Sequence, residues 1–184
     1  DRIVAELEGG GWSVLDWSPD DSAILLGESL SVNRSRRWLL DPATGKRTRL
    51  DRDDDEEVAW GGGRFAPDGA SIWATCDKGA EFARLVRWTP ESGAIEPATA
   101  DIPWDVEGFD LSPDGRSICF ITNEAGVSRV RILDTATGKH RPVEGLPAGV
   151  IAGGEWHPSG RHVAFTVGSA RSTADVYVLS LIHI

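Results

Sequence analysis

A ten-residue pattern that occurs four times constrains the fold of this chain more than any other feature. It reads "LSPDGRSICF" at residues 111–120, and its variants are "WSPDDSAILL", "FAPDGASIWA" and "WHPSGRHVAF". The prolines that anchor the four copies are 48, 46 and 45 residues apart, at Pro19, Pro67, Pro113 and Pro158. A near-constant period in this range predicts a repeat architecture, in which each unit buries its apolar faces against its neighbours.

Each copy of the pattern has the composition of a tight turn. Proline fixes its own φ at about −65°, which suits the second position of a type I turn. Gly115 can take the positive φ that a three-residue hairpin with a bulge needs. The first copy has Asp21 at this position, and Asp is one of the few side chains that tolerate positive φ. We therefore expect a hairpin at all four sites.

Strand-like segments surround these turns. "SICFIT", after the turn in the third repeat, is almost wholly apolar, which predicts burial on both faces of a sheet. In "SRVRILD", Arg129 and Arg131 alternate with Val130 and Ile132, which predicts a half-buried strand. A second turn follows as "DPATG", "TPESG" or "DTATG", and a short polar strand, "KRTRL", "AIEPA" or "KHRPV", closes the unit.

Four antiparallel strands per repeat define a propeller blade, so the sequence predicts an all-β partial β-propeller. We expect blades at residues 11–50, 58–98 and 104–144, an incomplete blade at 150–180, and the end of a preceding blade at 1–10. The fourth blade stops after its third strand, "ADVYVLS", without the second turn, and propellers close with about 4 to 8 complete blades, so we expect an open, incomplete ring. The ends of such an arc expose apolar surface, and we expect the isolated chain to be poorly soluble.

The chain ends in "LSLIHI", which is also the translation, in one frame, of a common sequencing-adapter sequence. We therefore expect residues 181–184 to be a non-native tail. The first residue is not Met, which favours an internal start within a longer protein.

The composition excludes several classes of function. The 184 residues carry a net charge of −10, whereas a nucleic-acid site needs a basic surface. No apolar run approaches the roughly 20 residues that span a bilayer, so no membrane partner is predicted. Cys76 and Cys119 lie at different offsets within their repeats, which favours two buried free thiols over a disulfide.

No catalytic, cofactor-binding or metal-binding residue is predicted. No serine lies in a Gly-x-Ser-x-Gly elbow, and the histidines lack metal-ligand spacing; they are His140, His157, His162 and His183. Gly9–Gly11 and Gly61–Gly63 match no nucleotide motif and are expected just before innermost strands, at the entry to a central channel.

Each of three other features has a structural interpretation and a functional alternative. The acidic run Asp51–Glu57 has the composition of a solvated loop, although a contact with a cation or a basic peptide is the alternative. Trp104-Asp105 is expected in a linker, where a WD dipeptide has no blade function. Glu81 and Arg84, between two strands of the second blade, have a substrate-facing role as their alternative.

The stretches between the turns resemble the propeller domain of bacterial prolyl oligopeptidase-family serine peptidases. The resemblance covers nearly the whole chain, and its most specific parts are "LPAGVI" and "SARSTADVY". In that family the propeller precedes an α/β-hydrolase domain with a Ser-Asp-His triad and filters its substrates. The resemblance thus implies two partners, a hydrolase domain of the same parent chain and the parent's peptide substrates.

Two alternatives stay open at this point. The same turn pattern is found in Tol-system periplasmic propellers, which would make the chain a protein-binding module. An intracellular WD-type scaffold is a third possibility, which the absence of Gly-His and properly placed Trp-Asp pairs disfavours. The compartment is open, with the cytoplasm slightly favoured over the periplasm.

Overall fold

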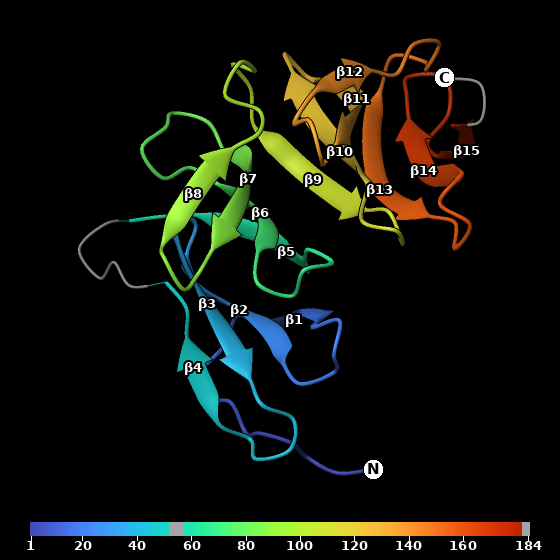
Figure 1. Ribbon diagram of the computed structural model, residues 1–184. Coiled ribbons are helices and arrows are strands. Elements are labelled where there is room, and N and C mark those ends of the chain that lie inside the picture. The colour runs from blue at the N-terminus through green and yellow to red at the C-terminus, as the bar shows by residue number, and fades with distance from the viewer. Residues whose placement is uncertain (52–56, 182–184) are drawn as a thin grey trace. The chain divides into compact units, whose positions relative to one another are not determined.

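The computed structural model describes residues 1–51 and 57–181, and within these ranges every regular element is a β-strand. The strands form four antiparallel sheets, in each of which neighbouring strands are consecutive in the sequence (Figure 1). The predicted all-β class with blade-type sheets is therefore confirmed. Most of the acidic run and the expected tail, residues 52–56 and 182–184, lie outside the described residues. No described segment forms a helix with the length and hydropathy needed to cross a bilayer.

The chain divides into two compact units, residues 1–100 and 101–184. The first unit holds two four-stranded sheets. Their strands are β1 (Trp12–Trp17), β2 (Ile24–Ser31), β3 (Arg34–Leu40) and β4 (Arg47–Arg49), then β5 (Trp60–Phe65), β6 (Ile72–Cys76), β7 (Arg84–Thr89) and β8 (Ala94–Pro97).

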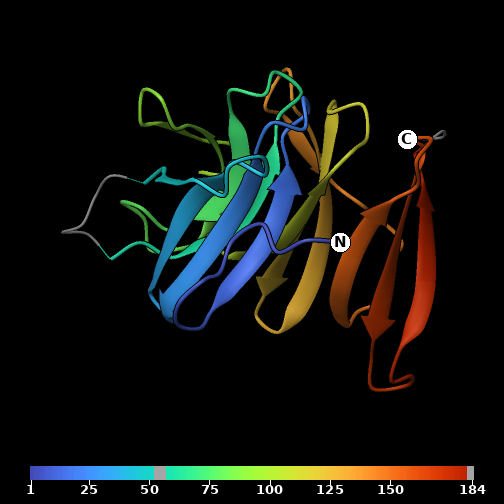
Figure 2. The same ribbon diagram turned by 90° about the horizontal axis from the view of Figure 1, so that it is seen from below.

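The second unit holds one four-stranded sheet and one three-stranded sheet. Their strands are β9 (Val106–Leu111), β10 (Ser117–Glu124), β11 (Val127–Asp134) and β12 (His140–Pro142), then β13 (Val150–Trp156), β14 (His162–Gly168) and β15 (Asp175–Ser180). Figure 2 shows β15 at the edge of the last sheet, beside β14.

The repeated turns have the predicted backbone. The glycines at the fourth turn position, Gly69, Gly115 and Gly160, have φ values of 67°, 68° and 67°. Asp21, which replaces glycine in the first repeat, has a φ of 58°. In the third repeat the Gly115 amide donates to the Ser112 carbonyl at 2.8 Å. All four hairpins therefore share one geometry.

Burial follows the predicted strand pattern. Residues Ile118 to Thr122 of β10 are all buried, as expected for a strand covered on both faces. In β11, Val130 and Ile132 are buried, whereas Arg129 is exposed. The second strand of the repeat is thus the apolar centre of its blade.

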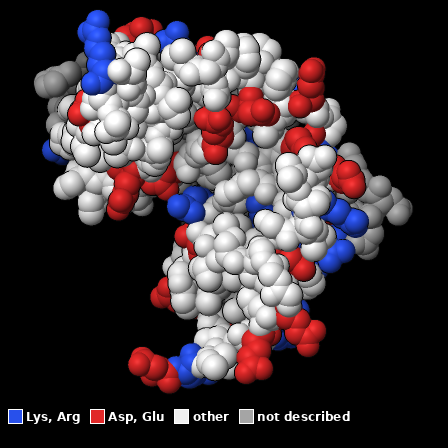
Figure 3. All heavy atoms as spheres, turned by 180° about the vertical axis from the view of Figure 1, so that it is seen from behind, with Lys and Arg blue, Asp and Glu red and all other residues white. Residues whose placement is uncertain are grey.

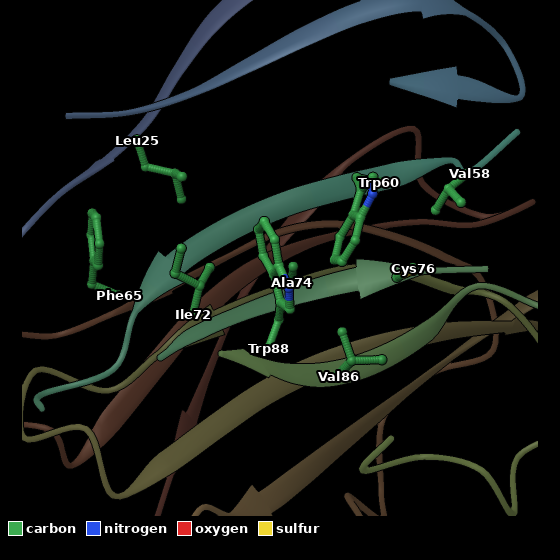
Figure 4. Close-up of a cluster of buried hydrophobic side chains, with 9 residues drawn as sticks. All are labelled: Leu25, Val58, Trp60, Phe65, Ile72, Ala74, Cys76, Val86 and Trp88. Carbon is green, nitrogen blue, oxygen red and sulfur yellow. The ribbon is translucent and has the colours of Figure 1, made fainter. Parts of the chain in front are cut away.

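Each unit has its core between its two sheets. In the first unit, Leu25 of β2 packs with Trp60, Ile72, Val86 and other side chains of the second sheet (Figure 4). In the second unit, Cys119 and Ile121 of β10 and Val130 of β11 pack with Ile151 and Phe165 of the last sheet. Face-to-face packing of consecutive blades therefore supplies the buried apolar surface in both units.

The glycine cluster Gly61–Gly63 corrects one expectation. It lies within β5, where the pairing with β6 is irregular between Gly61 and Arg64, and not before an innermost strand. A Cβ atom on Gly63 would lie 2.8 Å from the Leu25 Cδ2 atom. The cluster is a β-bulge that lets the first two sheets approach each other closely.

Residues 1–8 form no strand, but Val4, Ala5 and Leu7 pack against Ile24, Leu26 and Leu40 on the outer face of the first sheet. Whether residues 1–10 end a preceding blade stays a prediction, as do the predicted blade boundaries.

Candidate functional site

A Ser–His contact, which is the pairing that serine hydrolases use to activate their nucleophile, occurs within the turn of the fourth repeat. His157 Nδ1 lies 2.8 Å from Ser159 Oγ, and the Ser159 amide donates to the same nitrogen at 3.1 Å. In the third repeat the equivalent residue Ser112 bonds Asp114 in the same turn. The imidazole contact is therefore a variant of the turn hydrogen bond, which favours a structural role for His157.

The other described histidines also lie in structural settings. His140 Nε2 is 3.1 Å from Asp101 Oδ1, and this hydrogen bond lowers the pKa of the Asp101 carboxyl. The His162 ring meets the His157 ring edge-on at 6.0 Å. The described part of the chain holds no group of three potential metal ligands, and His183 lies outside it.

The two cysteines are free and buried, as predicted. Burial raises the pKa of the Cys76 thiol to about 11 and that of Cys119 to about 12. Both thiols are therefore protonated at neutral pH, and neither has the thiolate character of a nucleophile.

The structure does not join Glu81 to Arg84. Glu81 is exposed in the loop before β7, and Arg84 is the half-buried first residue of that strand. Within the described residues no ion pair links them, and the buried Arg84 Nε has no hydrogen-bond partner. The Trp104-Asp105 dipeptide lies outside the strands, as expected.

A serine clamps the first sheet to the second in the first unit. The Ser35 hydroxyl donates to the Trp60 carbonyl at 2.9 Å and accepts from the Trp60 amide at 2.8 Å. The Ser35 amide donates to the Val58 carbonyl at 3.0 Å. These bonds fix the start of β3 against the start of β5.

A buried arginine lies beside this clamp. Arg37 is 3% exposed, and its guanidinium donates to the Arg36 carbonyl at 3.1 Å and to the Gly62 carbonyl at 3.2 Å. Burial lowers the pKa of Arg37 to about 10, against the opposing effect of Asp51. Arg37 thus remains charged at neutral pH inside the interface between the two sheets.

A pocket of about 270 Å³ opens next to the clamp, between the first two sheets. Trp60 and Trp88 line it, with ring centroids 4.6 Å apart. Among the residues that the structure describes, the charged ones in its lining are Asp51, Arg34, Arg36, Arg49 and Lys78, and each of the four cations has an interaction partner. No sequence motif predicted this pocket, because its residues come from two different repeats.

Residues that line the pocket take part in ion pairs. Arg49 contacts Asp51 at 2.7 Å, and Arg36 lies 3.8 Å from Glu28. The second Asp51 oxygen accepts from the Arg37 amide at 2.7 Å. The chain as a whole carries a net charge of −10, and its acidic groups are spread over the face seen in Figure 3.

The fold places the chain among the β-propellers. No protein-family model matches it, and no curated protein matches it by sequence. TolB from Acinetobacter baumannii superposes with a TM-score of 0.72 and 20% identity, over 92% of this chain and 41% of that one. A putative TolB from Agrobacterium tumefaciens gives 0.71 and 19%, over 92% of this chain and 58% of that one.

A prolyl endopeptidase, from a study of inter-domain dynamics in catalysis and specificity, is similar too. It superposes with a TM-score of 0.73 and 14% identity, over 91% of this chain and 24% of that one. The chain thus spans less than two thirds of each of these proteins. Identities this low establish the shared propeller fold and no closer relationship.

Proposed function

We propose that this chain is a non-catalytic propeller domain of a prolyl oligopeptidase-family serine peptidase. In this role it gates the access of peptides to a hydrolase domain outside the 184 residues. The observation that carries the proposal is the fold match to a prolyl endopeptidase over 91% of the chain, together with the sequence resemblance to propellers of that family.

The mechanism of the proposed gate is steric. Blades that pack through apolar faces form a rigid wall, which admits short or unfolded peptides and turns folded proteins away. Exclusion of water when the domains close would strengthen the electrostatic stabilisation of the oxyanion in the hydrolase domain. The chain contributes shape and no reacting group.

The first test is an assay of the 184-residue chain with chromogenic peptide substrates. We expect no turnover, and activity that survives repurification would contradict the non-catalytic role. The second test is the gene sequence beyond Ser180, where we expect a Gly-x-Ser-x-Gly elbow of a hydrolase domain. A stop codon shortly after the last blade would refute the peptidase assignment.

The gating role can be tested only in the longer protein that contains the hydrolase domain. We expect the intact peptidase to cleave a short peptide and to spare the same sequence inside a folded protein. Removal of the propeller should abolish this discrimination, measured as the ratio of the two kcat/KM values. If the intact enzyme cleaves both substrates equally, the propeller is no gate.

A second candidate is a Tol-like protein-binding module. The two TolB structures have higher identity to this chain than the prolyl endopeptidase has, and the chain spans a larger share of their length. The stop codon that would refute the first proposal is the outcome that supports this one.

A further inference from the structure

The segment before the first sheet repeats the segment before the last sheet. "RIVAEL" at residues 2–7 precedes "RPVEGL" at residues 141–146 by the same distance that separates the first and last repeat prolines. The first two residues of "RPVEGL" end β12, the outer strand of the third sheet, and the Val143 amide continues its pairing by donating to the Val130 carbonyl at 2.9 Å. Residues 2–7 thus match the end of an outer strand and the linker that follows it.

The contacts of the two segments are also equivalent. Val143 and Leu146 pack against the apolar cluster that joins the third sheet (β9–β12) to the fourth sheet (β13–β15). Their counterparts Val4 and Leu7 pack against the buried side chains on the outer face of the first sheet. The first sheet is therefore covered in part by a segment that, in the second unit, belongs to the edge of a preceding sheet.

A tryptophan on the same face of the first sheet lacks such a cover. Trp17 has the repeat position of Trp156, which is 6% exposed, packs with the third sheet and donates its indole N–H to the Asp110 carbonyl at 3.0 Å. Trp17 pairs with Ile24, a residue of the outer face, and is 49% exposed. The first sheet therefore exposes a side chain that its equivalent buries against a preceding sheet.

The fourth sheet has the opposite deficit. It has three strands, and within the described residues β15 pairs only with β14, so β15 is an open edge strand (Figure 2). Val176 and Val178 of β15 are exposed, whereas their equivalents Val130 and Ile132 are buried between the third and fourth sheets. The fourth sheet thus lacks both an outer strand and a following sheet.

We propose that copies of this chain bind head to tail, with the fourth sheet of one copy stacked on the first sheet of the next. Residues 2–4 of the next copy form the missing outer strand on β15, while the rest of that segment keeps its place on the first sheet. The contact continues the face-to-face stacking that joins consecutive sheets within each unit, and it removes two apolar faces from water. It is a property of the 184-residue chain and depends on neither functional assignment.

The pairing of β11 with β12 fixes the register of the added strand. Ile132 pairs with Arg141 there, so Val178 of one copy pairs with Arg2 of the next. Directly opposed residues of antiparallel strands have Cα atoms about 4.5–5.5 Å apart. Because a disulfide bridges Cα separations of about 4.4–6.8 Å, cysteines at these two positions can report the contact.

The stacking of the third and fourth sheets fixes the place of the exposed tryptophan. Trp156 donates to Asp110 in that junction, and the residue of the fourth sheet equivalent to Asp110 is Glu155. Trp17 therefore donates its indole N–H to the Glu155 carbonyl of the other copy. Because tryptophan is one of the residues that contribute most to binding energy at interfaces, we expect Trp17 to anchor this contact.

The first experiment mixes two variants of the 184-residue chain, Arg2→Cys and Val178→Cys, under oxidising conditions. We expect a disulfide between the two variants and little linkage in either variant alone, because a head-to-tail contact opposes these positions in different copies. The native Cys76 and Cys119 are buried and should not react. Val32→Cys replaces Arg2→Cys in the control mixture and should not be linked, since Val32 lies in a hairpin outside the contact.

The second experiment measures association by analytical ultracentrifugation. The mass of the unmodified chain should rise with concentration, because a heterologous contact leaves a free binding face on every open assembly. Trp17→Lys should raise the dissociation constant at least about tenfold, since it removes the aromatic anchor. Val32→Lys places the same charge at another exposed apolar position and should leave the constant unchanged. Circular dichroism of each variant verifies folding.

Several results would overturn the proposal. A monomer at every concentration would do so on the unmodified chain, without reliance on any variant. Linkage of Val178→Cys to itself would show that two fourth sheets pair with each other. Equal linkage in the Val32→Cys mixture would assign association to unspecific aggregation. A chain with both Arg2→Cys and Val178→Cys that forms its disulfide only internally would show that the contact closes within one molecule.

Discussion

At the scale of single residues, the repeat turn shows which features the sequence alone determines. Positive φ at Asp21, Gly69, Gly115 and Gly160 was predictable because it follows from local turn chemistry. The buried Arg37 was not predictable, since the equivalent position of the third sheet holds Val130. Burial of a charge depends on the neighbouring sheet, which local patterns do not encode.

The positive-φ position of the repeat turn can be tested by two substitutions, one that adds a side chain and one that removes it. Gly160 has a φ of 67°, and a Cβ atom added there would meet no atom within 4 Å, so Gly160→Ala should suffer backbone strain alone. We expect a loss of about 1–2 kcal/mol in the free energy of unfolding. Asp21→Gly should change it by no more than about 0.5 kcal/mol, because relief of strain offsets the entropy of glycine. Urea unfolding measures both, and equal losses would contradict the shared turn geometry.

Arg37 offers a second test at this scale. Arg37→Ala removes the long side chain and leaves a cavity, so we expect it to lower the free energy of unfolding by about 2–4 kcal/mol. Arg37→Met keeps most of the volume and should lower it by less than about 1.5 kcal/mol. If methionine is as damaging as alanine in urea unfolding, the hydrogen bonds to the Arg36 and Gly62 carbonyls outweigh packing.

At the scale of elements, the Ser35 clamp and the repeat turns connect strands that the sequence predicted separately. The strands and their order within each sheet were predictable, because apolar runs and turn residues alternate along the chain. The bulge in β5 was not, because three consecutive glycines are equally compatible with a loop. Its cause is the close approach of Leu25 from the other sheet.

The Ser35 clamp has a counterpart in the second unit, where the Ser128 hydroxyl accepts a hydrogen bond from the Ile151 amide at 2.9 Å. Ser35→Ala leaves the Trp60 amide without its partner, and Ser128→Ala does the same to the Ile151 amide. We expect each substitution to cost about 1–3 kcal/mol of unfolding free energy, as for a buried amide that loses its hydrogen bond. Hydrogen exchange should accelerate at Trp60 in the first variant and at Ile151 in the second, and acceleration at neither amide would contradict the clamp.

The aspartate in the turn of the second repeat, Asp68, predicts that the stability of the fold depends on pH. Burial raises the pKa of Asp68, but hydrogen bonds from Ser71 and Arg87 outweigh this effect and lower the pKa from 3.8 to about 2. A lowered pKa in the folded state adds stability above about pH 4, and this stability is lost as the pH falls toward 2. The urea midpoint of Asp68→Asn should therefore differ from that of the parent chain most above pH 4.

The difference should narrow toward pH 2, where about half of the Asp68 carboxyl in the folded parent chain is protonated. Glu91→Gln, which removes one negative charge from an exposed position in the turn between β7 and β8, is the control for the general effect of net charge. A gap of constant size from pH 6 to pH 2 would assign the effect of Asp68→Asn to something other than its charge.

At the scale of the whole molecule, one sheet face lacks the cover that its equivalents have. Val176 and Val178 of β15 are 75% and 64% exposed, whereas the equivalent Val130 and Ile132 of β11 are 2% and 6% exposed. Val150 of β13 is exposed as well. We therefore predict that this face is the surface through which the isolated chain aggregates, if it is as poorly soluble as the sequence leads us to expect.

That surface can be modified directly. We expect Val176→Lys with Val178→Lys to reduce light scattering and to raise the monomer fraction in size-exclusion chromatography. Val32→Lys, at a residue that is 96% exposed in a hairpin of the first unit, is the control and should change little. Equal improvement in the control would show that added charge acts in general, and not through β15.

The pocket between the first two sheets could not be predicted from the sequence alone. Its cations, such as Arg34 and Lys78, belong to different repeats, and no spacing rule links them. They become neighbours only when the first two sheets stack.

The sequential strand order has a consequence for biosynthesis. Because every strand pairs with strands next to it in the sequence, each sheet can form as soon as its own last strand has left the ribosome. The Ser35 bonds must wait for Val58 and Trp60 to emerge. A nascent chain therefore assembles its blades in the order of translation, with each newly completed hairpin extending what is already folded.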